Sequence, residues 1–89
     1  MKITLFYFAR LKETLKYSTE ELTLPISAYE KPLTIIQLKG ILAKRGDVWQ
    51  QMLLGKLKVR GAINHALVDD NAEINDGDEV AFFPPVTGG

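Results

Sequence analysis

The residues with the clearest chemical meaning lie at the end of the chain, where the sequence finishes in two glycines. Residues 82–89 combine two phenylalanines, two prolines, a valine, a threonine and the terminal Gly88 and Gly89. Consecutive prolines favour polyproline II, so residues 84–89 are expected to run straight off the body for roughly 19 Å at ~3.1 Å per residue. The glycines carry no side chain, so the tip of this tail is narrow enough to enter a channel in a partner protein.

The reactive group at this end is the carboxyl group of Gly89. An α-carboxyl group is ionised at neutral pH, and a carboxylate resists nucleophilic attack. Adenylation would supply a leaving group, after which an amine, a thiol or a sulfide could be acylated. The residues therefore predict a carrier or a tag that delivers its own carboxyl group into another protein's active site. A glycine tail without function is the alternative.

The remaining candidates for chemistry point to ordinary structural roles. His65 has no cysteine or second histidine with which to share a metal, and its neighbours predict a solvated turn. Gly55 and Lys56 lack the spacing of a phosphate-binding loop, and the acids of residues 69–79 have Ile74 where a calcium loop needs a ligand. Trp49 is expected to pack in the core and not to stack a ligand. We therefore expect no metal and no bound cofactor.

Composition narrows the class of protein further. The chain has 89 residues, 11 basic against 11 acidic, and no cysteine. A net charge of zero argues against nucleic-acid and membrane-surface partners, and the lack of thiols excludes disulfides, cysteine nucleophiles and persulfides. No signal peptide and no apolar run of about 18 residues is present, so a cytoplasmic protein is expected.

The first elements that must support the tail are strands. Residues 1–8 are rich in β-branched and aromatic types with apolar side chains on both faces, which predicts a central strand covered on both sides. Residues 10–20 show no clear period and predict a loose connection. Residues 21–25 alternate in polarity up to a proline and predict the second strand of a hairpin.

A helix follows the loop of residues 26–32. Thr34 and Gln37 have the spacing of a capping box, and apolar residues then recur at helical spacing until Gly46. Asp47 is expected to cap a second short helical segment, which ends near Gly55.

The C-terminal half predicts strands at residues 57–63, 66–68 and 79–83, with turns at 64–65, 69–71 and 75–78. Two strands, a main helix and further strands indicate an α+β fold, with one mixed sheet and the helix packed across one face. We expect residues 1–83 to form one domain and residues 84–89 to form the protruding tail.

Two stretches carry a resemblance to a known family. Residues 3–13, which begin Ile-Thr-Leu-Phe-Tyr-Phe-Ala-Arg, and residues 76–89, which end Phe-Phe-Pro-Pro-Val-Thr-Gly-Gly, closely resemble the MoaD family, the small subunits of molybdopterin synthase. The resemblance implies the β-grasp, ubiquitin-like fold. After Glu13 the family commonly has a turn glycine that this chain lacks, and the loop of residues 26–32 is longer than usual.

The resemblance also implies a mechanism. An E1-like enzyme would use ATP and Mg²⁺ to adenylate the carboxylate of Gly89, and a sulfur donor protein would convert it to a thiocarboxylate. Within a heterotetrameric synthase, the tail would then give sulfur to the cyclic pyranopterin monophosphate precursor of molybdopterin. Gly88 would provide clearance, and the catalytic groups would belong to the large subunit, so this chain is expected to be a non-catalytic subunit.

Docking onto the large subunit requires exposed apolar surface. Phe83, at the base of the tail, and Leu67, on the neighbouring return strand, are the candidates, and core packing is the alternative for each. Phe82 and Phe83 must point to opposite faces of their strand, so only one can face the helix. Lys12 or Arg10 could add charge at the rim. The tail residues expected to contact the partner are Pro84, Pro85, Val86 and Thr87.

Two other functions remain open at this point. A sulfur carrier for thiazole or transfer-RNA thiolation would share the fold and the terminal glycines, although the run of residues 82–87 favours the molybdopterin branch. A ubiquitin-like modifier would form isopeptide bonds through its tail. In a simple binding domain the tail would have no function.

Overall fold

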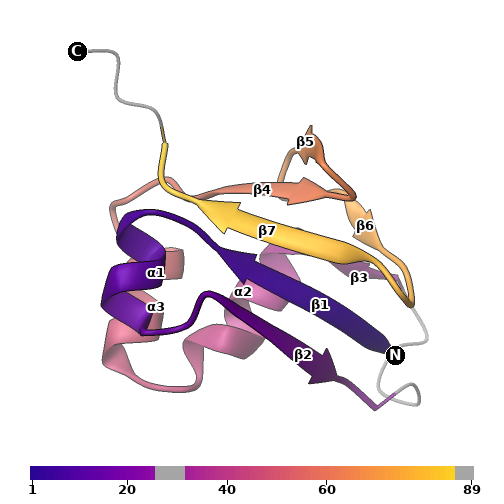
Figure 1. Ribbon diagram of the computed structural model, residues 1–89, viewed down its shortest axis with the longest axis horizontal. Coiled ribbons are helices and arrows are strands. Elements are labelled where there is room, and N and C mark those ends of the chain that lie inside the picture. The colour runs from indigo at the N-terminus through magenta and orange to yellow at the C-terminus, as the bar shows by residue number, and fades with distance from the viewer. Residues whose placement is uncertain (26–31, 86–89) are drawn as a thin grey trace.

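The computed structural model describes residues 1–25 and 32–85 and arranges them in two layers, a five-stranded sheet and a set of helices behind it (Figure 1). The sheet has the order β2-β1-β7-β4-β5, in which β1 and β7 are parallel and the other neighbours are antiparallel. Its strands are β1 (Lys2–Tyr7), β2 (Thr19–Thr23), β4 (Arg60–Ile63), β5 (Ala66–Val68) and β7 (Glu79–Phe83). The expected α+β architecture with a mixed sheet is confirmed.

Only one face of β1 is covered in the part of the chain that the structure describes. Ile3, Leu5 and Tyr7 are buried towards the helices, whereas Phe6 on the opposite face is partly exposed and Phe8 is half exposed. The strand is central, as expected, but the prediction that both of its faces are covered is wrong. Apolar residues on both faces of a strand predict burial on both sides, and here one apolar face remains accessible.

A short helix, α1 (Arg10–Leu15), replaces the loose connection predicted for residues 10–20. Leu11 and Leu15 lie four residues apart and are both buried in the core. The Leu11 amide donates to the carbonyl of Phe8 at 3.1 Å, so the helix begins directly after β1. The prediction failed because a single apolar pair among charged residues is a very short helical signal.

The main helix, α2 (Ile35–Ala43), begins at the predicted capping box. The Gln37 amide donates to Thr34 Oγ1 at 3.4 Å, and the Thr34 amide donates to Gln37 Oε1 at 3.0 Å. The second segment is helix α3 (Asp47–Leu54), but Gly46 occupies its N-cap position and no side chain caps it. The expected capping role of Asp47 is therefore wrong, although its carboxylate lies in the first turn, where the helix dipole favours negative charge.

The C-terminal strands agree with the prediction in order but differ in detail. Strand β4 begins at Arg60 instead of residue 57, and a separate two-stranded sheet pairs β3 (Leu33–Thr34) with the unpredicted β6 (Glu73–Ile74). The turn at Asn64 and His65 has positive φ at both residues, 49° and 72°. Of the predicted loop over residues 26–32, residues 26–31 lie outside the described residues.

The core lies between the sheet and the helices. At its centre α2 contacts β4 closely, because a Cβ atom on Gly61 would approach Ile35 Cγ2 to 3.3 Å. The buried apolar side chains come from α1, α2, α3 and the inner face of the sheet, and they include Leu5, Tyr7, Leu11, Leu38, Leu42, Leu53, Val80 and Phe82. The opposite face of the sheet has no helix over it in the described ranges (Figure 1).

Candidate functional site

The two phenylalanines at the end of β7 have separate environments. Phe82 has no exposed surface and stacks against Tyr7 with ring centroids 6.3 Å apart. Phe83 is partly exposed and lies on the opposite side of the sheet, because successive side chains of a strand alternate between faces. The structure therefore assigns Phe82 to the core and leaves Phe83 accessible at the base of the tail.

Phe83 belongs to a surface that we call the open face, the side of the sheet turned away from the helices. The strand register places Leu67 opposite Ala62, Ala62 opposite Ala81, and Ala81 beside Phe6, so one apolar row crosses four strands. Leu67 is 61% exposed, which excludes core packing for this candidate. The open face consists of Thr4, Phe6, Phe8, Arg60, Ala62, Leu67, Glu79, Ala81 and Phe83.

A shallow hollow of about 140 Å³ lies within the open face. Phe6, Phe8 and Ala81 supply its apolar lining, and His65 and Glu79 stand at its edge. His65 Nε2 lies 3.3 Å from Glu79 Oε1, and the His65 side chain is 88% exposed, as expected for a solvated turn. An apolar hollow with a polar edge suits one anchoring side chain of a protein partner.

The tail leaves the sheet beside α1. The Phe8 amide donates to the carbonyl of Phe82 at 3.1 Å, which joins the end of β1 to the end of β7. Pro84 and Pro85 follow β7 and are partly exposed, and Arg10 and Lys12 of α1 are exposed nearby. The predicted tail residues Val86, Thr87, Gly88 and Gly89 lie outside the described residues.

A cluster of polar and aromatic side chains links β1 and β2 to the helices on the covered side of the sheet. Arg45 forms a two-pronged ion pair with Glu20 at 2.7 and 2.8 Å, and its guanidinium lies 4.5 Å from the centre of the Trp49 ring. The Tyr7 hydroxyl donates to Glu20 Oε2 at 2.8 Å. Trp49 also packs edge-on against Tyr7 and Tyr17, which agrees with its predicted structural role.

This cluster changes the acidity of its members. Burial alone would raise the pKa of Glu20, but the hydrogen bonds from Arg45 and Tyr7 outweigh it and hold that pKa below its ordinary value. Burial and the neighbouring Glu20 carboxylate raise the pKa of Tyr7. The shift of Glu20 reflects its ion pair with Arg45, which joins β2 to the link between α2 and α3, whereas the shift of Tyr7 comes first from burial. We therefore assign the cluster to stability.

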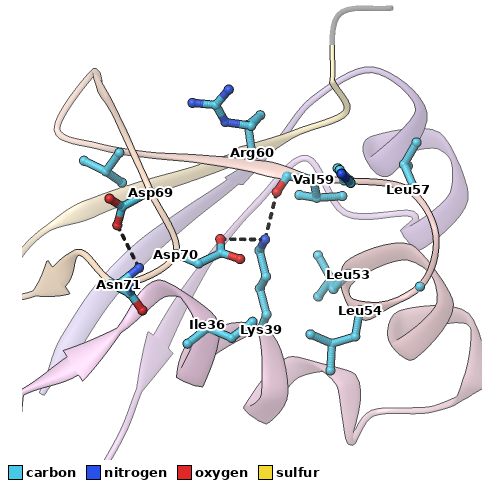
Figure 2. Close-up of a pocket in the computed structure, with 13 residues that line it drawn as sticks. Ile36, Lys39, Leu53, Leu54, Leu57, Val59, Arg60, Asp69, Asp70 and Asn71 are labelled. Atoms are coloured by element: carbon cyan, nitrogen blue, oxygen red, sulfur yellow. Dashed lines mark hydrogen bonds and ion pairs between the residues drawn. The ribbon is translucent and has the colours of Figure 1, made fainter.

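A cavity of about 610 Å³ lies where β4 and β5 separate (Figure 2). Lys39 of α2 is only 3% exposed at its floor, and its Nζ donates to the Val59 carbonyl at 2.8 Å and to Asp70 Oδ1 at 2.9 Å. Extending the β4–β5 register beyond Gly61 and Val68 would bring Val59 opposite Asp70. Lys39 therefore bridges two segments where the strand ladder has opened, a role that the sequence analysis missed.

Residues 1–25 and 32–85 contain no group of three or more histidine, cysteine, aspartate or glutamate residues placed to hold a metal ion. The same ranges contain no helix with the length and apolar character needed to cross a membrane. What they present is an accessible apolar face beside the root of the tail. The sequence analysis selected Phe83 and Leu67 from this face but missed Phe6, Phe8 and Ala81, for which the apolar outer face of β1 was the available signal.

Comparisons with known proteins agree with this geometry. Residues 5–89 match the model of the ThiS family. The chain is 37% identical over 87 residues to the molybdopterin synthase sulfur carrier subunit of Escherichia coli strain K12, covering 98% of this chain and 99% of that protein.

Solved structures show the same fold. SAMP1 from Haloferax volcanii superposes with a TM-score of 0.75 at 21% identity, covering 100% of both chains. A complex of subunits 1 and 2 of the molybdopterin-converting factor from Helicobacter pylori 26695 gives a TM-score of 0.63 at 22% identity, also covering 100% of both chains. The expected β-grasp, ubiquitin-like fold is confirmed.

Proposed function

Because this chain belongs to the ThiS family, we propose that it is a sulfur carrier in molybdenum cofactor biosynthesis and the small subunit of molybdopterin synthase. The observation that carries the proposal is the extent of the similarity. The family match runs to Gly89 and so includes the tail, and the E. coli sulfur carrier subunit is similar over 98% of this chain.

Activation of the tail is the first step of the proposed function. The carboxylate of Gly89 attacks the α-phosphate of Mg²⁺-bound ATP in an E1-like enzyme, and pyrophosphate leaves. Hydrosulfide delivered by a donor protein then attacks the carbonyl carbon of the acyl adenylate, the carbon–oxygen bond to AMP breaks, and Gly89 carries a thiocarboxylate. The chain contains no cysteine, so no side chain can carry the sulfur as a persulfide. The sulfur is therefore bound covalently at the main-chain carboxyl group of Gly89.

Transfer is the second step. The tail enters the large subunit, where the thiocarboxylate gives its sulfur to the cyclic pyranopterin monophosphate precursor. Pro84 and Pro85 direct the tail away from the body, Val86 and Thr87 contact the wall of the partner's channel, and Gly88 leaves room beside the reacting carbonyl. The large subunit supplies the catalytic groups, and the two kinds of subunit form a cytoplasmic heterotetramer.

The open face supports docking onto that large subunit. Phe83 lies at the base of the tail, and Leu67 and Phe8 of the same open face remain 61% and 50% exposed. An exposed apolar area next to a functional segment is typical of a protein interface. The relative from H. pylori was solved as a complex of its subunits 1 and 2, and we propose the corresponding assembly for this chain.

Intact mass spectrometry tests the proposal directly. The chain is incubated with its activating enzyme, ATP and a sulfur source, and the mass gain for the replacement of one oxygen by sulfur is measured. Persistent absence of this species, with an activating enzyme that is active on its usual carrier, would exclude the carrier function.

Deletion of Gly89 is expected to abolish thiocarboxylate formation and sulfur transfer, because the tail then ends one residue short of the reacting groups. The melting temperature should remain that of the intact chain, since Gly89 lies beyond the last strand. Substitution Thr87→Ser, which keeps the length of the tail, is the matched control and should retain transfer. Full sulfur transfer by the shortened chain would contradict the proposed role of the carboxyl group.

A further inference from the structure

Five cations belong to the two segments next to the end of β7, helix α1 and the residues that lead into β4, and we call them the basic collar. Arg10 and Lys12 lie in α1, and Lys56, Lys58 and Arg60 lie in the segment that leads into β4. The register places Arg60 opposite Phe83, the last residue of β7, on one side. On the other side α1 follows the end of β1, which is hydrogen-bonded to Phe82 (Figure 1). The tail therefore leaves the body between two groups of positive charge.

The collar is not neutralised within the described residues. All five side chains belong to exposed residues, and none has a carboxylate of residues 1–25 or 32–85 within the 4.0 Å of an ion pair, whereas Lys2, Lys39 and Arg45 each do. Three acids belong to the same cavity or the same helix as these cations. Asp70 is bound to Lys39, Asp69 accepts from the Asn71 amide, and Glu13 is the one acid in α1.

The compensating acids lie at the opposite end of β7. Asp76 and Asp78 precede this strand and Glu79 begins it, and Asp76 accepts a hydrogen bond from the amide of Lys2 at the start of β1. Although the net charge of the chain is zero, its charges are distributed unevenly along β7. The collar cations lie at the end next to the tail, and the three acids lie at the other end. A concentration of one sign on a surface attracts and orients a partner of the opposite sign.

The segment that carries the collar into β4 is anchored to the core at Val59. Along residues 56–60 the cations are exposed, whereas Val59 is buried and its carbonyl accepts from Lys39 Nζ (Figure 2). Burial of Val59 and the bond from a buried lysine hold the backbone in place, so Lys58 and Arg60 project from a fixed support. A fixed charge loses less conformational freedom on binding than a charge on a mobile loop.

We propose that the basic collar docks on an acidic rim of the large subunit, around the entrance through which the tail passes. The inference rests on the proposed function and adds the electrostatic character of the partner surface. The polyproline II conformation expected from the sequence would put the terminal carboxyl group roughly 19 Å from the collar, more than twice the Debye length of about 8 Å in physiological salt. The collar therefore acts on protein at the channel entrance and not on phosphate groups at the reacting carboxyl.

The test is the association of the full chain with the large subunit, measured by surface plasmon resonance over a series of salt concentrations. The double substitution Lys58→Glu and Arg60→Glu is expected to slow association about tenfold at low salt and to flatten its salt dependence. The matched control is Lys2→Glu with Lys44→Glu, two exposed lysines outside the collar segments with the same change in net charge; Lys2 begins β1, at the end of the sheet opposite the tail. The control should change association by no more than about twofold.

A melting curve for each variant separates docking from folding. If Lys58→Glu with Arg60→Glu lowers the melting temperature, the neutral pair Lys58→Gln and Arg60→Gln is measured instead and should show about half the effect on association. Unchanged association for the folded variants would overturn the proposed docking of the collar on the large subunit. An effect confined to adenylation by the activating enzyme would overturn it too. Failure of the unaltered chain to bind the large subunit would instead overturn the proposed function.

Discussion

Phe82 and Phe83 are neighbours in the sequence with different tasks. Successive side chains of β7 point to opposite faces of the sheet. Phe82 therefore packs in the core against Tyr7, and Phe83 lies on the open face opposite Arg60. Deep burial makes Phe82 important for the free energy of folding. Partial exposure makes Phe83 available to a partner at the point where the tail begins.

The substitution Phe83→Ala is expected to weaken binding to the large subunit by roughly 2 kcal/mol, about thirtyfold, because it removes a large apolar contact at the centre of the interface. Its melting temperature should change little. The affinity is measured by isothermal titration calorimetry and the stability by calorimetric melting.

The matched control is the adjacent substitution Phe82→Ala. Loss of this buried side chain is expected to lower the free energy of unfolding by about 3–5 kcal/mol, with binding affected only through the loss of folded protein. The assignment of the two residues would be contradicted if Phe83→Ala destabilised the fold as strongly as Phe82→Ala.

At the level of single elements, α2 shows how far local sequence determines structure. Its start is fixed by reciprocal hydrogen bonds between Thr34 and Gln37, and both residues are close in sequence. Its packing depends on a distant residue, because Gly61 of β4 leaves the space in which Ile35 lies. The capping box could therefore be recognised from the sequence, but the contact between α2 and β4 could not.

The substitution Thr34→Ala is expected to destabilise the fold by about 1 kcal/mol, because it leaves the Gln37 amide without its capping oxygen. Denaturant unfolding measures the change. Thr14→Ala, at an exposed position of α1, is the control and should stay within about 0.5 kcal/mol of the original chain. Equal stability of the two variants would show that the cap contributes nothing to the fold.

The elements that the sequence analysis missed share a physical cause. Helix α1 has six residues and one apolar pair, Leu11 and Leu15, so its period is hard to detect. Strands β3 and β6 have two residues each and exist because segments far apart in the sequence meet. Long patterned elements such as β1, α2 and β7 were predictable because their side chains repeat over more than one turn or pleat.

At the level of the whole molecule, the cluster around Arg45 connects parts that are distant in sequence. Its ion pair with Glu20 joins the edge strand β2 to the link between α2 and α3, and Tyr7 connects both to the centre of the sheet. Because the cluster closes one side of the fold, the protonation of Glu20 affects the stability of the entire domain.

The folded state favours ionised Glu20, because its pKa lies below the ordinary value of 4.5. The resulting stabilisation is complete above that ordinary value and is lost as the pH falls through the lower pKa of the folded state. We therefore expect Glu20→Gln to lower the melting temperature near neutral pH and to differ less from the original chain near about pH 3.

Melting temperatures measured from neutral to acidic pH check this expectation. The control is Glu21→Gln, whose ion pair with Lys2 is exposed and should contribute little at any pH. A melting temperature difference between Glu20→Gln and the original chain that did not shrink with acidification would contradict the link between the ion pair and stability.

The sequence by itself determined the main strands, the capped helix, the order of the elements and the chemical character of the tail, because these depend on residues that are close together along the chain. It also selected Phe83 and Leu67 as candidates. Only the tertiary structure decided which face of β7 is buried and that one face of β1 remains open. It also decided that the segments with the cations, α1 and the residues leading into β4, lie next to the end of β7. These features arise from strand pairing and helix packing between distant segments, which a local pattern does not specify.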